Sequence, residues 1–147
     1  MAKPASSELV AVAWLLTIPG ITQAGTTLPQ DVQTWAESGF VKIGTIGGDP
    51  MRHIPVREPV MEFACFAVNP GTLHPNWLGA SDLAEAIVRA CEDNLSLNTP
   101  LNVRAGYRQA RVVGAWPVTD PERFEDDSAS YGRFDLNAVI RWIEIPE

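Results

Sequence analysis

RFDLNAVIRW, the stretch at residues 133–142, alternates apolar and polar side chains. Its apolar members are Phe134, Leu136, Ala138, Ile140 and Trp142, and they are separated by Asp135, Asn137 and Arg141. Because successive side chains of a β-strand point to opposite faces of a sheet, this pattern predicts a strand with one buried face and one partly solvated face. We expect the strand to run from Arg133 to Ile145.

Further elements are expected upstream of this strand. Runs of mostly apolar, β-forming residues predict strands at Phe40–Ile46, Val60–Val68 and Ala110–Val118. A helix is predicted at Asn76–Ser96, where apolar residues recur at steps of three and four and form one stripe. A shorter helix is expected at Pro29–Glu37.

The order of these elements, with a first helix at about Ser7–Thr17, is α, short α, β, β, α, β, β. Paired strands with intervening helices indicate an α+β fold. We therefore expect a mainly antiparallel four-stranded sheet with a long helix packed across one face, plus an N-terminal helix. At 147 residues, the chain has the usual size of one domain, so residues 1–147 are expected to form a single unit.

The first helix is apolar around its whole circumference, with Pro19-Gly20 at its end. A helix of this kind must be covered on more than one side, and a small sheet offers one. We therefore expect part of its cover to come from another subunit. Three of its residues are candidates for that interface: Val10, Trp14 and Leu15.

Composition and charge exclude several classes of protein. With 46% apolar and 20% charged residues, the chain is neither disordered nor a coiled coil. Its net charge of −7 argues against sequence-independent phosphate binding, which needs a basic surface. The apolar stretch Leu9–Leu16 is too short to span a membrane, and Glu8 beside it argues against a secretory signal.

No catalytic, metal or cofactor site is expected. His53 and His74 have no second ligand at metal-binding spacing. Cys65 and Cys91 are expected to be reduced, buried and chemically idle, since neither has a local base or a cationic neighbour. The glycines of residues 44–48 lack the Lys-Ser/Thr pair of a phosphate-binding loop.

An acidic segment lies between the last two predicted strands. Its carboxylates are Asp120, Glu122, Glu125, Asp126 and Asp127, against the single cation Arg123. It lacks the ordered ligand spacing of an EF-hand. Three interpretations stay open: a solvated linker, an arm that docks to a partner and becomes ordered there, and a surface that faces a polyanion without binding it. We favour docking, and we count these five residues as candidate interface residues.

Several local patterns together resemble a known family. They are Trp14-Leu15-Leu16-Thr17-Ile18-Pro19-Gly20-Ile21, Gly39-Phe40-Val41 after Trp35, the strand Pro59–Val68, Asn76-Trp77 with Leu83–Ile87, Trp116-Pro117-Val118, the acidic loop at 121–127, Tyr131-Gly132-Arg133-Phe134, and Asp135–Trp142. In this order they resemble the tail terminator (tail completion) proteins of long-tailed bacteriophages that infect actinobacteria. The likeness covers most of the chain.

The resemblance implies a structural virion protein and not an enzyme. Such proteins form a hexameric ring on the tail tube, end its polymerisation and join it to the head-closure or connector protein, and DNA passes through the ring without specific binding. It also implies assembly in the host cytoplasm and a place in the tail or neck of the virion. Other neck components, a tail tube subunit and a small α+β enzyme or ligand-binding domain remain as alternatives.

Overall fold

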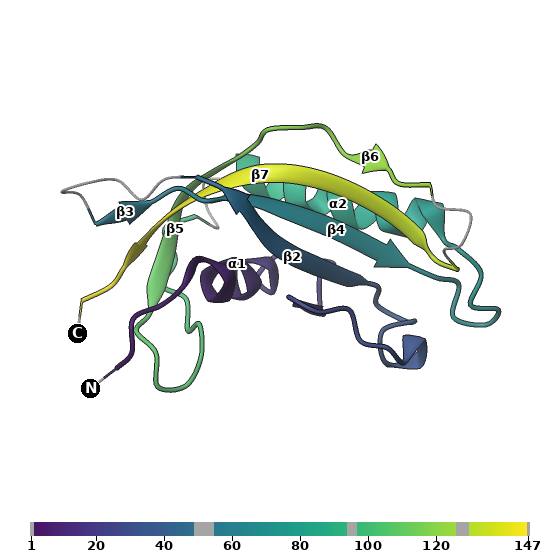
Figure 1. Cartoon of the computed structure of the whole chain (residues 1–147), viewed down its shortest axis with the longest axis horizontal. Helices are drawn as coiled ribbons and strands as arrows, with labels where there is room; N and C mark the ends of the chain where they lie inside the picture. Colours follow the sequence, from purple (N-terminus) through teal and green to yellow (C-terminus); the bar gives the residue numbers. More distant parts are fainter. Residues whose placement is uncertain (1, 49–54, 94–96, 126–129, 147) are drawn as a thin grey trace.

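The computed structural model describes residues 2–48, 55–93, 97–125 and 130–146 (Figure 1). In chain order its elements are α1 (Ser7–Leu15), β1 (Ala24–Gly25), the 3-10 turn η1 (Val32–Thr34), β2 (Phe40–Gly47), β3 (Val56–Arg57), β4 (Val60–Ala67), α2 (Trp77–Glu92), β5 (Ala110–Pro117), β6 (Glu122–Arg123) and β7 (Gly132–Glu144).

The strand β7 organises the sheet, because it pairs with β3, β4, β5 and β6. All of these pairings are antiparallel, and β2 continues the sheet beyond β4. Val139 of β7 is opposite both Val60 of β4 and Trp116 of β5, so β4 and β5 lie on opposite sides of β7. β1 pairs with β2 in parallel, and an isolated parallel bridge joins Lys3 to Tyr107.

The α+β class, the mostly antiparallel sheet and both helices are confirmed, and the four long strands lie within two residues of their predicted bounds. The predicted strand number is wrong, since the sheet has seven strands among the described residues alone. The three additional strands are two residues long. A pair of residues carries no periodic signal, so only a neighbouring strand defines such elements. The predicted short helix at Pro29–Glu37 is too long, because only the three-residue 3-10 helix η1 forms within it.

Both helices lie on the same face of the sheet. The ring of Phe63 in β4 lies 6.5 Å from that of Trp14 in α1, and a side chain on Gly79 in α2 would contact Ala67 of β4. Residues 63 and 67 share one face of the strand because they are an even number of positions apart. Met61, Phe63 and Cys65 are therefore buried under the helices, in one core with Leu136, Ala138, Ile140 and Trp142 of β7.

The helix α2 begins and packs as its sequence predicts. Asn76 caps it by accepting a hydrogen bond from the backbone N–H of Gly79 at 2.9 Å. Its apolar stripe is buried against the sheet: Ala80, Leu83, Ala84, Ile87, Ala90, Cys91. No helix among the described residues has the length and apolar character needed to cross a membrane.

One side of the helix α1 is covered by its own chain. Figure 1 shows it in the hollow of the curved sheet, between β2 and β5. Val10 and Leu15 are 0% exposed and Trp14 is 1% exposed. The other side of α1 is not fully covered, since three of its residues are partly exposed there: Leu9, Val12 and Ala13. The reason for placing Val10, Trp14 and Leu15 at an interface is nevertheless removed, because these side chains belong to the core of one chain.

We expect Val10→Asp to unfold the chain itself, because it leaves a carboxylate buried without a partner. The predicted loss is at least about 3 kcal/mol in the free energy of unfolding, measured by urea denaturation at low protein concentration. Leu16→Asp is the matched control, since Leu16 is 49% exposed just beyond the same helix, and it should cost less than about 1 kcal/mol. Equal stability of the two variants would contradict this placement of α1.

Candidate interaction surface

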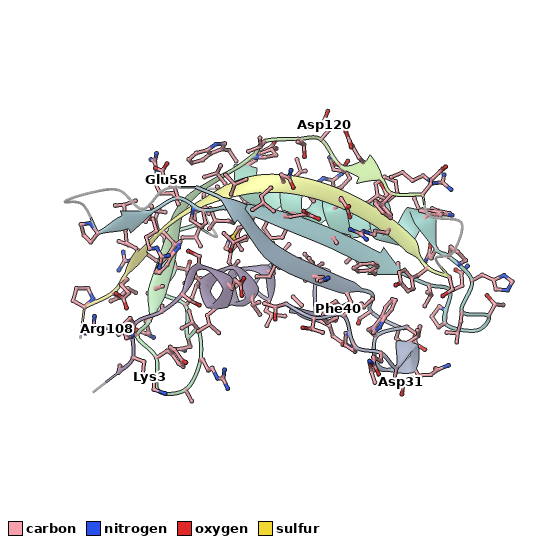
Figure 2. All side chains as sticks on the ribbon, in the orientation of Figure 1. Lys3, Asp31, Phe40, Glu58, Arg108 and Asp120 are labelled. Atoms are coloured by element: carbon pink, nitrogen blue, oxygen red, sulfur yellow. The ribbon has the colours of Figure 1, made fainter. Side chains whose placement is uncertain are left out.

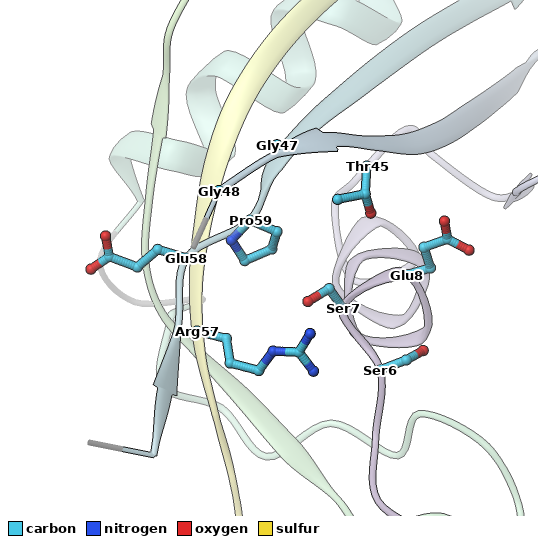
Figure 3. A pocket seen from close by; sticks show the side chains of 9 residues that line it. All are labelled: Ser6, Ser7, Glu8, Thr45, Gly47, Gly48, Arg57, Glu58 and Pro59. Carbon is cyan, nitrogen blue, oxygen red and sulfur yellow. The ribbon is translucent and has the colours of Figure 1, made fainter. Parts of the chain in front are cut away.

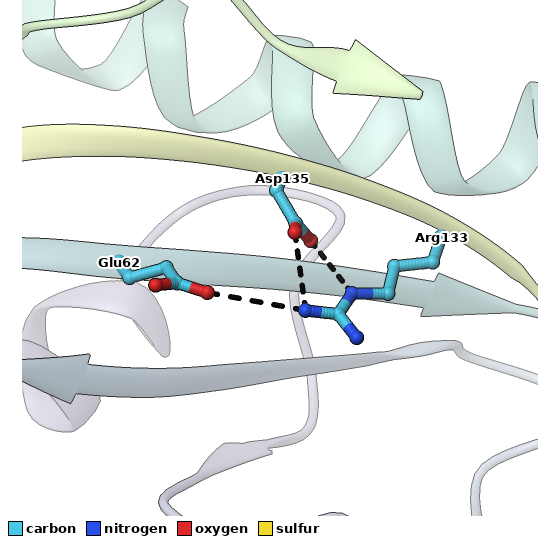
Figure 4. Close-up of polar contacts among 3 residues, drawn as sticks. All are labelled: Glu62, Arg133 and Asp135. Atoms are coloured by element: carbon cyan, nitrogen blue, oxygen red, sulfur yellow. Dashed lines mark hydrogen bonds and ion pairs between the residues drawn. The ribbon is translucent and has the colours of Figure 1, made fainter. Parts of the chain in front are cut away.

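The face of the sheet opposite the helices, called the outer face below, is only partly covered. Along β7 the even-numbered residues 136–142 are buried, whereas the odd-numbered residues 133–139 are partly exposed and Arg141 is exposed. The wet face that the alternation predicted is therefore present. Figure 4 looks onto this face, with both helices behind the strands.

An apolar cluster covers one end of the outer face. The ring of Phe66 lies 5.1 Å from that of Tyr131 and 6.4 Å from that of Trp35, which follows η1. The edge-to-face geometry of these rings is favourable. This cluster packs the segment around η1 onto the sheet and leaves the rest of the face open.

A charged cluster centred on Arg133 occupies the middle of the outer face (Figure 4). The guanidinium of Arg133 donates to both carboxylate oxygens of Asp135, with N–O distances of 2.8 and 3.1 Å. Its Nη2 lies 3.9 Å from Oε1 of Glu62. The guanidinium also lies 4.1 Å from the ring centre of Phe124. Two hydrogen bonds and an aromatic contact fix the Arg133 side chain in one orientation.

The far end of the outer face carries exposed apolar side chains. Trp116 is 39% exposed and has the guanidinium of Arg141 at 5.3 Å from its ring centre. Arg141 also pairs with Glu58. Val118 and Ile46 are exposed as well. Trp and Arg are enriched among residues that dominate the energy of protein interfaces, so this end has the composition of a contact surface.

Residues 119–125, called the acidic strap below, lie along β7. The backbone N–H of Asn137 donates to Oγ1 of Thr119 at 2.9 Å, and that of Phe124 donates to the carbonyl of Arg133 at 2.9 Å. Between these two points β6 pairs with β7. The guanidinium of Arg123 lies 3.8 Å from the ring centre of Trp77, at the start of α2.

The position of the acidic strap bears on the expected free arm and on the expected docking role. The acidic segment is not a free arm up to Glu125, because β7 and Trp77 hold it without any partner. The sequence signal was present in Phe124 and Arg123, which stand among the acids and anchor the strap. Asp120, Glu122 and Glu125 are exposed, and docking through them stays a prediction. Asp126 and Asp127 lie outside the described residues.

A polar cavity of about 260 Å³ lies between the start of α1 and the turn after β2 (Figure 3). Both serines beside it have structural tasks. Oγ of Ser6 accepts from the backbone N–H of Leu9 as the helix cap, and Oγ of Ser7 accepts from the indole N–H of Trp142 at 3.0 Å. Arg57 contacts the ring of the same Trp142. Through these contacts the two serines hold the start of α1 in place.

Cys65 and Cys91 are free and buried, as predicted. Burial raises the pKa of the Cys65 thiol far above its usual range, with a smaller effect from Asp135. Burial, and to a lesser degree Glu92, raises the pKa of Cys91 to about 11. The thiolate is the nucleophilic form, so both groups are held in their unreactive state at neutral pH.

Within the part of the chain that the structure describes, no three His, Cys, Asp or Glu side chains are grouped to hold a metal ion. His74 lies in the turn before α2, and His53 is outside the described residues. No family model matches the chain, and no curated protein matches it in sequence.

We expect Trp77→Ala to loosen the acidic strap, because it removes the ring beneath Arg123. Such a contact is worth about 0.5–1 kcal/mol, so hydrogen exchange of the Phe124 amide should quicken about two- to fivefold, as measured by NMR. Leu78→Ala is the matched control, because Leu78 is adjacent and 74% exposed. Unchanged exchange in the Trp77 variant would show that the strap is held by β6 alone.

We expect the Cys91 thiol to make stability depend on alkaline pH. Its pKa is raised in the folded chain from 9.0 to about 11, so its contribution is complete below pH 9 and is lost as the pH rises toward 11. Wild type should lose up to about 2–3 kcal/mol more than Cys91→Ala over this range, measured by urea denaturation. Parallel curves for the two proteins would exclude this linkage.

Proposed function

We propose that the chain is a structural subunit of a ring at the head-proximal end of a phage tail tube, where it ends polymerisation and joins the tail to the head connector. One observation carries this proposal: part of the outer face of the sheet remains open and displays Trp116, Val118 and Ile46 to solvent. A surface that combines exposed aromatic residues with ordered arginines is suited to protein contacts.

The chemistry of the described residues points in the same direction. The buried thiols are held protonated, and the serines at the polar cavity cap or anchor α1. Polar groups with these structural tasks are typical of a scaffold. The order of the elements also agrees with the resemblance to tail terminator proteins, which supports the ring and its place in the tail or neck.

The net charge of −7 fits a ring through which DNA passes. A conduit lined by carboxylates repels phosphates, whereas a basic lining would hold them. In this proposal the ring is hexameric, and its partners are the tail tube protein on one side and the head-closure or connector protein on the other. Assembly takes place in the host cytoplasm.

The test is negative-stain electron microscopy of the purified chain, alone and mixed with tail tubes. We expect rings that cap one end of each tube. Rings that bind only to heads would indicate a head-closure or connector protein, and incorporation along the tube would indicate a tube subunit. A chain that stays monomeric and turns over a small-molecule substrate would place it among enzymes and overturn the proposal.

We expect Trp116→Asp to raise the protein concentration needed for ring formation at least tenfold. The substitution places a charge in the exposed apolar end of the outer face. Sedimentation velocity measures the assembly, and circular dichroism checks the fold. Leu78→Asp is the control, because it places the same charge at an exposed apolar residue on the helical side, where Leu78 is 74% exposed against 39% for Trp116. If both variants assemble like the wild type, the Trp116 end is not a contact surface.

A further inference from the structure

The cations of this acidic chain are not spread evenly. Lys3, Arg104 and Arg108 gather where the segment before α1 meets the loop before β5, and we call this group the basic corner. Backbone hydrogen bonds join the two segments: the N–H of Lys3 donates to the carbonyl of Gly106, and the N–H of Arg108 donates to the carbonyl of Lys3, both at 2.8 Å. The basic corner is therefore a fixed part of the fold.

Most of the charge at the basic corner is unpaired within the described chain. Arg108 lies 3.7 Å from Glu144. Among the residues that the structure describes, neither Lys3 nor Arg104 has a carboxylate partner, and both are exposed. The ammonium of Lys3 lies 5.6 Å from the ring centre of Tyr107, in a cation–π contact that leaves its charge in place.

The opposite charge gathers on the outer face. Glu62, Glu122 and Asp135 line a hollow of about 210 Å³ there, together with Thr119 and Asn137. Arg133 pairs with Asp135 and approaches Glu62. Glu122 has no cationic partner among the described residues. Asp120 of the acidic strap extends the negative surface, whereas Glu125 pairs with Arg123 at 3.1 Å.

The basic corner and the acidic strap lie on opposite sides of the molecule. Figure 2 shows Lys3 and Arg108 side by side at one corner and Asp120 across the width of the sheet. The two groups therefore cannot neutralise each other within one chain. Two copies can bring them together only when the corner of one meets the outer face of the next.

We propose that the occupant of the outer face is a second copy of this chain, which docks its basic corner against Glu122 and the acidic strap. This inference rests on the proposed function, since it names the contact between successive ring subunits. A two-fold symmetric contact through either surface would set like charges against each other. The charge pattern thus favours a head-to-tail contact, which generates a ring when its rotation closes.

Charge reversal with rescue tests this contact. The corner variant is Lys3→Glu with Arg104→Glu, and the strap variant is Asp120→Lys with Glu122→Lys. Each sets like charges together, so we expect each to raise the concentration needed for assembly at least tenfold. The quadruple variant, which combines all four substitutions, restores opposite charges with reversed polarity. It should assemble at a concentration within about threefold of that of the wild type. Mass photometry and sedimentation velocity measure the assemblies, and circular dichroism checks each fold.

The matched control is Asp82→Lys with Glu85→Lys on the exposed side of α2, which makes the same change in net charge as the strap variant. It should assemble like the wild type. Raising the salt concentration from about 0.05 to 0.5 M should weaken wild-type assembly, because exposed charges are screened.

The outcomes test the proposed contact separately from the proposed ring. If the wild type forms rings and both reversed variants do so equally well, the contact is wrong and the proposed function stands. If both reversed variants fail to assemble and the quadruple variant does not restore assembly, the two surfaces do not meet and the proposed contact is again wrong. A wild-type chain that stays monomeric, alone and on tail tubes, overturns the proposed function and the contact with it.

Discussion

Every layer of this fold depends on the hydrogen bonding of β7 along both of its edges. β3 and β4 pair with one edge, and β5 and β6 pair with the other. Because its side chains alternate, the same strand assigns Leu136 and Ile140 to the core and Arg133 and Asp135 to the outer face. A change that shifted β7 by one residue would exchange these two sets. The register of β7 thus determines both the core and the candidate contact surface.

Much of this arrangement could be predicted from the sequence, since long periodic elements carry their own signal. The alternation from Phe134 to Trp142 correctly indicated one buried and one wet face, and the apolar stripe correctly indicated α2. The short strands could not be predicted, because two residues acquire strand geometry only from a neighbour. The surroundings of α1 were misjudged for a related reason: a sequence does not report the curvature of a sheet, and that curvature encloses Val10 and Leu15.

The candidate surface was predictable only in part. The acids of the strap were visible in the sequence, but its attachment depends in part on a contact between distant residues, that of Arg123 with Trp77. The basic corner joins residues about one hundred positions apart and has no local signature. Charge patterns that depend on such long-range pairing become visible only once the backbone is placed.

The position of β7 in the chain also bears on biosynthesis. It is the last element of the domain to leave the ribosome, yet it templates strands that were made long before it. Until it emerges, β4 and β5 have no common neighbour, and the apolar side chains of α1 and α2 lack the part of their cover that β7 supplies. Such non-local pairing slows folding, and exposed strand edges favour aggregation. We therefore expect the nascent chain to depend on chaperones, or on low temperature during expression, until translation of this domain is complete.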